Sequence, residues 1–180
     1  LRAAEHRTSL MTPPLRVATW NLENLGENPA TLEARARSIA WAIGHNLKAP
    51  HIIAVQEFCG DAQAQGDVPV PATKNAQILI DALRDCCGET YAYTEVAPKN
   101  NCDGGRRGVN IRCGYFYRTD RVKLAPSAHP LETTNPTLQV NAHNLQFIGA
   151  NPAQLKPQHP CFEESRKPLA AQFTDIATQE

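Results

Sequence analysis

The chain has 180 residues, which is enough for one domain with a substantial core and too few to predict two. Lysine plus arginine and aspartate plus glutamate number 18 each, so the net charge creates no overall field that would attract nucleic acid. No apolar run reaches the length of a membrane span, so no membrane-spanning helix is expected within these residues.

The first residues have the character of a leader. Residues 1–14 are expected to be a disordered leader, with Met11 as a possible start, and residues 15–180 to form one domain. The stretch LRAAEHRTSL has no hydrophobic segment typical of a secretion signal. This favours a cytoplasmic location.

Six cysteines are present, without any Cys-x-x-Cys pair: Cys59, Cys86, Cys87, Cys102, Cys113 and Cys161. Without a secretion signal, reduced thiols are favoured over disulfides. His159 and Cys161 form the one close His/Cys grouping. A protein that binds a metal through cysteine and histidine is therefore one possible function, in addition to the two that are described below.

The first three elements form a β-α-β unit. The stretch LRVATW predicts a strand over residues 15–20, because branched and aromatic side chains favour strands. Asn28 followed by Pro29 predicts the start of a helix, whose apolar spacing continues to about Lys48. HIIAVQ predicts a second strand over residues 51–56. Such units cross over right-handedly, which makes the two strands parallel.

The rest of the chain predicts a second helix, four strands and two loops. The helix is expected over residues 72–87, and the strands over residues 91–96, 110–117, 121–125 and 168–173. KNNCDGGRRG (99–108) predicts a flexible basic loop. Seven of the fourteen prolines lie between residues 126 and 168, so a long proline-rich loop is expected over about residues 126–167.

Asn21 and Glu57 directly follow the two parallel strands. Parallel strands end at the same edge of a sheet and lie about 4.8 Å apart, so both side chains are expected near one point. A carboxylate and an amide oxygen can share a hard cation such as Mg²⁺, with Mn²⁺ or Ca²⁺ as alternatives. Ligands of open α/β sheets bind beyond the carboxyl ends of the strands. The alternative is an ordinary turn with a solvated glutamate.

Four segments carry a resemblance to a known family. TWNLENL, followed by a helix and IIAVQE, resembles the opening of the endonuclease/exonuclease/phosphatase superfamily, the metal-dependent phosphodiesterases that include the pancreatic-type deoxyribonucleases. GVNIRCGYFYRTDRV (108–122) and ESRKPLAAQF (164–173) resemble a bacterial branch related to extracellular nucleases. The resemblance implies an α/β fold, a four-layer sandwich of two mixed β-sheets flanked by helices.

The resemblance also implies roles for single residues. Glu57 matches the metal-binding glutamate of the family, and Asn21 the asparagine beside the metal and the scissile phosphate, so these two are the catalytic candidates. Asn110 lies where family members often contact substrate, with a plain strand-start role as the alternative. Arg118 and Arg166 are candidates for phosphate contact, with structural roles as the alternatives.

The chain departs from the family in its later motifs. An Asn-His pair, a Gly-Asp-x-Asn segment and a final Asp-His are absent, and His143 lies in the proline-rich loop, where it is not expected to replace them. The sequence therefore resembles the N-terminal portion of a domain without its water-activating side. Unpaired strand edges are expected, and activity is expected to require the C-terminal half.

The resulting prediction is a divalent-metal-dependent phosphodiesterase that hydrolyses phosphodiester bonds in the manner of a nuclease. Its domain is expected to be incomplete in this chain and inactive alone. Lys99, Arg106 and Arg107 hint at a nucleic-acid substrate. The alternative is a non-catalytic remnant or interaction module of the same fold.

Overall fold

A mixed four-stranded sheet forms the centre of the computed structural model, which describes residues 13–61, 66–127, 136–144 and 146–179. The strand order is β1-β2-β4-β3, with bounds Val17–Leu25, Ile52–Phe58, Arg112–Arg118 and Tyr91–Glu95. β1 and β2 are parallel, whereas β4 is antiparallel to both β2 and β3. β1 therefore lies at an edge of this sheet.

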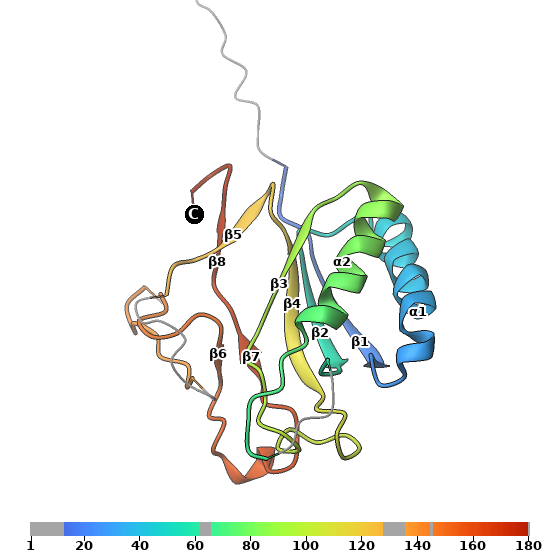
Figure 1. The fold of residues 1–180 in the computed structure, drawn as a ribbon. Helices are drawn as coiled ribbons and strands as arrows, with labels where there is room; N and C mark the ends of the chain where they lie inside the picture. Colours follow the sequence, from blue (N-terminus) through green and yellow to red (C-terminus); the bar gives the residue numbers. More distant parts are fainter. Residues whose placement is uncertain (1–12, 62–65, 128–135, 145, 180) are drawn as a thin grey trace, which may run out of the picture.

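Two helices cover one face of the sheet (Figure 1). Helix α1 spans Pro29–Trp41 and continues into a π-helical turn, Ala42–Asn46. Its first turn is capped because the side-chain oxygen of Asn28 accepts a hydrogen bond from the Ala30 N–H at 3.0 Å. Helix α2 spans Thr73–Cys87 and ends at Gly88, whose positive φ of 73° suits glycine.

The hydrophobic core lies between these helices and the sheet. β1 and β2 contribute Leu22, Leu25, Ile53 and Phe58, the helices contribute Leu32, Ala36, Leu79 and Leu83, and β4 contributes Phe116. All of them are at most 5% exposed. Burying apolar area of this size is the main favourable term in folding.

The other face of the sheet carries short strands from the C-terminal third. β5 (Val122–Leu124) pairs with β8 (Phe173–Asp175), and β6 (Ala153–Gln154) pairs with β7 (Leu169–Ala170). These segments are held to the main sheet through β4. Tyr115 donates its hydroxyl hydrogen to the carbonyl of Leu169 at 2.7 Å. The ring of Phe173 also packs against those of Tyr115 and Tyr117.

The predicted α/β class and the parallel β-α-β unit are confirmed. The first strand is longer than predicted, since it continues through an irregular stretch to Leu25. The predicted strand at 168–173 is wrong as a single element, because two short strands, β7 and β8, replace it. Residues 1–12 of the predicted leader lie outside the described residues, as do 128–135 and 145 of the proline-rich loop.

The described part of that loop holds little regular structure. It contains β6, a 3-10 turn at Pro160–Phe162 and isolated bridges. Among the helices that the structure describes, none has the length and apolar character needed to cross a bilayer. The four-layer sandwich stays a prediction.

Candidate functional site

The carboxyl ends of β1 and β2 lie side by side and carry the polar residues singled out by the sequence. The register pairs Asn21 with Gln56, so Glu57 is the next residue beyond that pair. β1 becomes irregular between Asn21 and Leu25. Glu57 has a φ of 55°, a region that residues other than glycine rarely adopt. Backbone of this kind is concentrated at functional sites, which makes this edge of the sheet a candidate site.

Asn21 and Glu57 are joined by a hydrogen bond. The Asn21 side-chain Nδ2 donates to Oε1 of Glu57 at 2.9 Å. The backbone N–H of Glu23 donates to Asn21 Oδ1 at 2.9 Å, so the two ends of the amide have different partners. Because a backbone N–H can only donate, this contact sets the orientation of the amide. The parallel strands thus deliver the amide and the carboxylate to one point.

Arg166 completes a three-residue cluster with them. Its Nη1 donates to the same Glu57 Oε1 at 2.5 Å, across 109 residues of sequence. The pKa of Glu57 is held below its usual range, mainly by the hydrogen bond from Asn21 and next by the one from Arg166. Partial burial of the carboxylate opposes this shift. The Glu57 and Arg166 side chains are 23% and 32% exposed, so the cluster is accessible to solvent.

Arg35 supports the irregular end of β1, and the sequence analysis missed it. Its Nη2 donates to the carbonyls of Leu22 and Glu23 at 2.9 and 2.8 Å. These contacts tie helix α1 to the backbone beside Asn21. The helical pattern alone shows only that Arg35 lies on a polar side of α1, since its partners depend on how the helix packs.

The buried side chain of Asn110 forms hydrogen bonds to residues of the 99–108 loop. It is 1% exposed, and its Oδ1 accepts from the Asn101 N–H at 2.6 Å. Its Nδ2 donates to Asn100 Oδ1 and to the Gly108 carbonyl. The structure therefore gives Asn110 a role in shaping the 99–108 loop, and its substrate contact stays a prediction.

Arg118 lies at the opposite end of the sheet from the Asn21–Glu57–Arg166 cluster. Its backbone N–H donates to the carbonyl of His51, which precedes β2, whereas Glu57 is at the other end of that strand. Six residues of strand span about 20 Å. The Arg118 guanidinium is paired with Glu89 and Asp120. It cannot contact a phosphate held by the cluster, because antiparallel pairing places it away from that edge. Its contact with another part of a substrate stays a prediction.

Two cations of the basic loop are paired with carboxylates. Lys99 lies 2.9 Å from Asp67, and Arg106 pairs with Glu27 in the connection between β1 and α1. Ion pairs that are open to solvent contribute little to stability. They leave the predicted nucleic-acid contact untested.

A metal ion has two candidate oxygen donors in the cluster. Among the described residues, Glu57 Oε2 has no hydrogen-bond partner, and Asn21 Oδ1 has only the Glu23 N–H. No group of three His, Cys, Asp or Glu side chains that could hold a metal occurs in the part of the chain that the structure describes. All six cysteines are free, and His159 contacts Cys161 without a third ligand.

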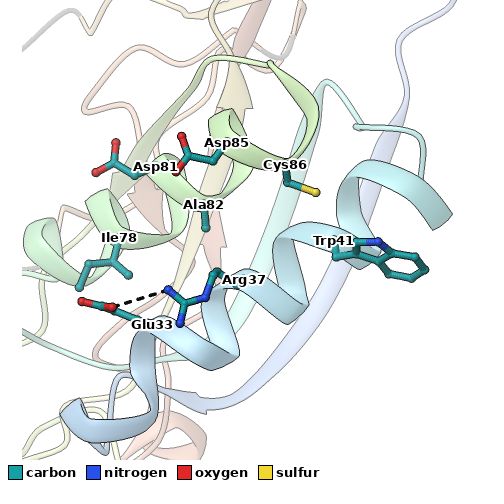
Figure 2. A pocket seen from close by; sticks show the side chains of 8 residues that line it. All are labelled: Glu33, Arg37, Trp41, Ile78, Asp81, Ala82, Asp85 and Cys86. Atoms are coloured by element: carbon teal, nitrogen blue, oxygen red, sulfur yellow. Dashed lines mark ion pairs between the residues drawn. The ribbon is translucent and has the colours of Figure 1, made fainter.

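A hollow of about 410 Å³ lies elsewhere, between α1 and α2 (Figure 2). An ion pair between Glu33 and Arg37, with N···O 3.6 Å, lines it together with Trp41 and Cys86. No residue of the Asn21–Glu57–Arg166 cluster lines this hollow. It belongs to the surface of the helical layer and not to the candidate site.

The fold and the cluster together define an α/β protein with a carboxylate, an amide and a guanidinium at the carboxyl ends of parallel strands. No protein-family model and no curated protein matches the chain.

Solved structures that match include two bacterial proteins of the endonuclease/exonuclease/phosphatase family. The one from Bacteroides vulgatus is 18% identical with a TM-score of 0.41, and the alignment covers 92% of this chain and 49% of that one. The one from Bacteroides thetaiotaomicron is 18% identical with a TM-score of 0.32, over 62% of this chain and 32% of that one. A humanized D. rerio TDP2 with 14 mutations is 19% identical with a TM-score of 0.32, over 63% and 33%. The chain thus spans a third to a half of their length.

Proposed function

We propose that this chain forms one side of a divalent-metal-dependent phosphodiesterase site of the endonuclease/exonuclease/phosphatase type. The reaction proposed for this site is nuclease-like hydrolysis of phosphodiester bonds. The Asn21–Glu57–Arg166 cluster carries the proposal. An ionised carboxylate, an amide oxygen and a guanidinium at one strand edge are suited to a phosphate diester and a hard cation. The sequence resemblance assigns the same two residues, Asn21 and Glu57, to metal and phosphate.

The residues fit a hydrated Mg²⁺ ion, with Mn²⁺ or Ca²⁺ as substitutes. Magnesium keeps several waters and takes one or two protein carboxylates together with substrate phosphate oxygens. Glu57 would supply the carboxylate and Asn21 Oδ1 the second donor. When bound, such an ion acts as a Lewis acid on a phosphoryl oxygen. Arg166 neutralises part of the Glu57 charge, so metal affinity without substrate is expected to be weak.

Arg166 and Asn21 would orient the phosphate. A guanidinium presents parallel N–H donors to two phosphate oxygens, and it could exchange its bond to Glu57 for this contact when a diester enters. Among the described residues, no histidine is hydrogen-bonded to the cluster. We therefore infer that the attacking water is activated by residues outside the Asn21–Glu57–Arg166 cluster. The chain alone is expected to hydrolyse phosphate diesters at a negligible rate.

The alternative function is a non-catalytic interaction module. The observation that favours it is the Arg166–Glu57 pair itself, which already satisfies one carboxylate oxygen without a ligand. The substrate also remains a proposal. Nucleic acid is favoured by the basic 99–108 loop, which adjoins the β1–α1 connection through the Arg106–Glu27 pair.

Titration of Mn²⁺ into the ¹⁵N-labelled chain tests the metal site. We expect paramagnetic broadening centred on the amide signals of Asn21 and Glu57, and its loss in Glu57→Gln. Glu33→Gln on α1, whose side chain is 73% exposed, is the matched control and should broaden like the wild type. Broadening that is centred elsewhere, or that survives in Glu57→Gln, would remove the metal role and favour the interaction module.

A further inference from the structure

Two loops that are far apart in sequence meet beside the candidate site. One is the 99–108 loop, and the other is the segment 162–167, which carries Arg166. Both lie at the end of the sheet where β1 and β2 terminate (Figure 1). The Asp103–Lys167 ion pair, with N···O 3.3 Å, joins them.

Lys167 is buried at this junction. The residue is 8% exposed, and Asp103 is 3% exposed. The Lys167 Nζ donates to the carbonyls of Phe162 at 2.6 Å, Ser165 at 2.8 Å and Cys102 at 3.3 Å. An ammonium placed among three carbonyls and a carboxylate cross-links the two backbones, because its acceptors come from both loops.

A close backbone contact reinforces the junction. Gly104 has a φ of 82°, and a Cβ added there would lie 2.5 Å from the Glu164 carbonyl oxygen. Real Cβ atoms do not approach a carbonyl so closely, so only glycine permits this packing. Glu164 itself has a φ of 49°, a region that residues other than glycine rarely adopt.

We propose that this junction positions Arg166 on Glu57, with Lys167 as the positioning residue. Arg166 directly precedes Lys167 in the chain, and its guanidinium is one-third exposed. A long exposed side chain on a free loop would lose much conformational entropy on pairing. The junction removes the backbone part of that freedom, as supporting contacts do for a preorganised site. The inference rests on the proposed function, which supplies the reason for holding Arg166 at the strand ends.

Carbon-detected NMR can follow the pH titration of the Glu57 carboxyl in the metal-free chain. The midpoint of this titration reports directly whether Arg166 is paired with Glu57. Arg166→Met serves as the reference and should raise the midpoint, because it removes a hydrogen bond to the ionised form. Gly104→Ala should produce most of the same upward shift. Gly88→Ala is the matched control, since Gly88 has a similar φ of 73° with nothing within 4 Å, and it should leave the midpoint unchanged.

Lys167→Met provides a second route to the same result. It should also raise the Glu57 midpoint, while Lys99→Met, on the same loop but paired with Asp67, should not. If Lys167→Met fails to fold because Asp103 is left unpaired, Gly104→Ala in its partly exposed loop decides the question. A lower melting temperature with a wild-type Glu57 midpoint would overturn the proposal and leave a purely structural junction. Since no metal is present, this result is independent of the Mn²⁺ experiment.

Discussion

Arg112 is a charged side chain on the buried side of β4. Strand alternation directs Arg112, Gly114 and Phe116 to the same face, and Arg112 is 1% exposed. Its guanidinium donates to the carbonyls of Val70 and Asn110, and it pairs with Glu95 at 2.9 Å. Every charge and carbonyl in this network is satisfied, which is the condition for burying an ion pair.

Replacing Arg112 with methionine is expected to reduce the free energy of unfolding by about 3–5 kcal/mol, because Glu95 would remain as an unpaired buried charge. Urea denaturation followed by circular dichroism measures this loss. Adding Glu95→Gln should recover part of it. Arg84→Met on the exposed side of α2 is the control and should change stability by less than about 0.5 kcal/mol. Equal losses of stability in Arg112→Met and Arg84→Met would show that the buried Arg112–Glu95 pair is unimportant.

The start of helix α2 depends on a residue outside it. Residue Ala72, at the N-cap position, has no capping side chain. Instead Asp61, in the loop after β2, accepts from the Lys74 and Asn75 N–H groups, both at 2.9 Å. This carboxylate also lies near the positive end of the helix dipole. The element therefore begins where the β2 loop meets it, a dependence that local sequence does not contain.

Asp61→Ala should destabilise the protein by about 1 kcal/mol, the usual loss for a helix cap. Amide hydrogen exchange should increase first in the opening turn of α2, since its N–H donors lose their acceptor. Asp85→Ala, in the last turn of the same helix with a side chain 79% exposed, is the comparison and should be nearly neutral. Unchanged exchange in the first turn of Asp61→Ala would refute the capping role.

The molecule as a whole is expected to lose stability in mild acid through His51. This residue is 5% exposed, and its Nδ1 accepts from the Arg16 N–H at 2.9 Å. Burial, followed by the charges of Arg16, Arg118 and Arg121, lowers the pKa of His51, and Asp120 acts in the opposite direction. Protonation would also place two donors face to face, so the folded state favours neutral His51.

The sign of the pH effect follows from this depressed pKa. Below a pH of about 6.5, the unfolded chain protonates His51 more readily than the folded chain does. The free energy of unfolding should therefore fall as the pH drops below that value, before the carboxyl groups titrate. Urea denaturation between pH 7.5 and 5 measures the slope. His51→Asn, which retains an acceptor, should flatten it, and an identical slope in this variant would exclude His51 as the source.

The placement of Asn21 beside Glu57 could be predicted from sequence, whereas their contact with Arg166 could not. The first depends on one short-range rule, that a β-α-β unit brings two strand ends together. The second joins β2 to a segment 109 residues later, past a proline-rich stretch with no periodic pattern. The distance of Arg118 from the cluster could not be predicted for a related reason, because no local pattern states which end of an antiparallel strand faces the site.

By itself the sequence determined the α/β class, the parallel strand pair and the strand-end positions of the amide and the carboxylate, since these follow from side-chain periodicity and chain handedness. Only the tertiary structure decided the inward charge of Arg112, the cap from Asp61 and the guanidinium that meets Glu57. These contacts join residues brought together by packing, and packing depends on the whole set of buried surfaces and not on any local pattern.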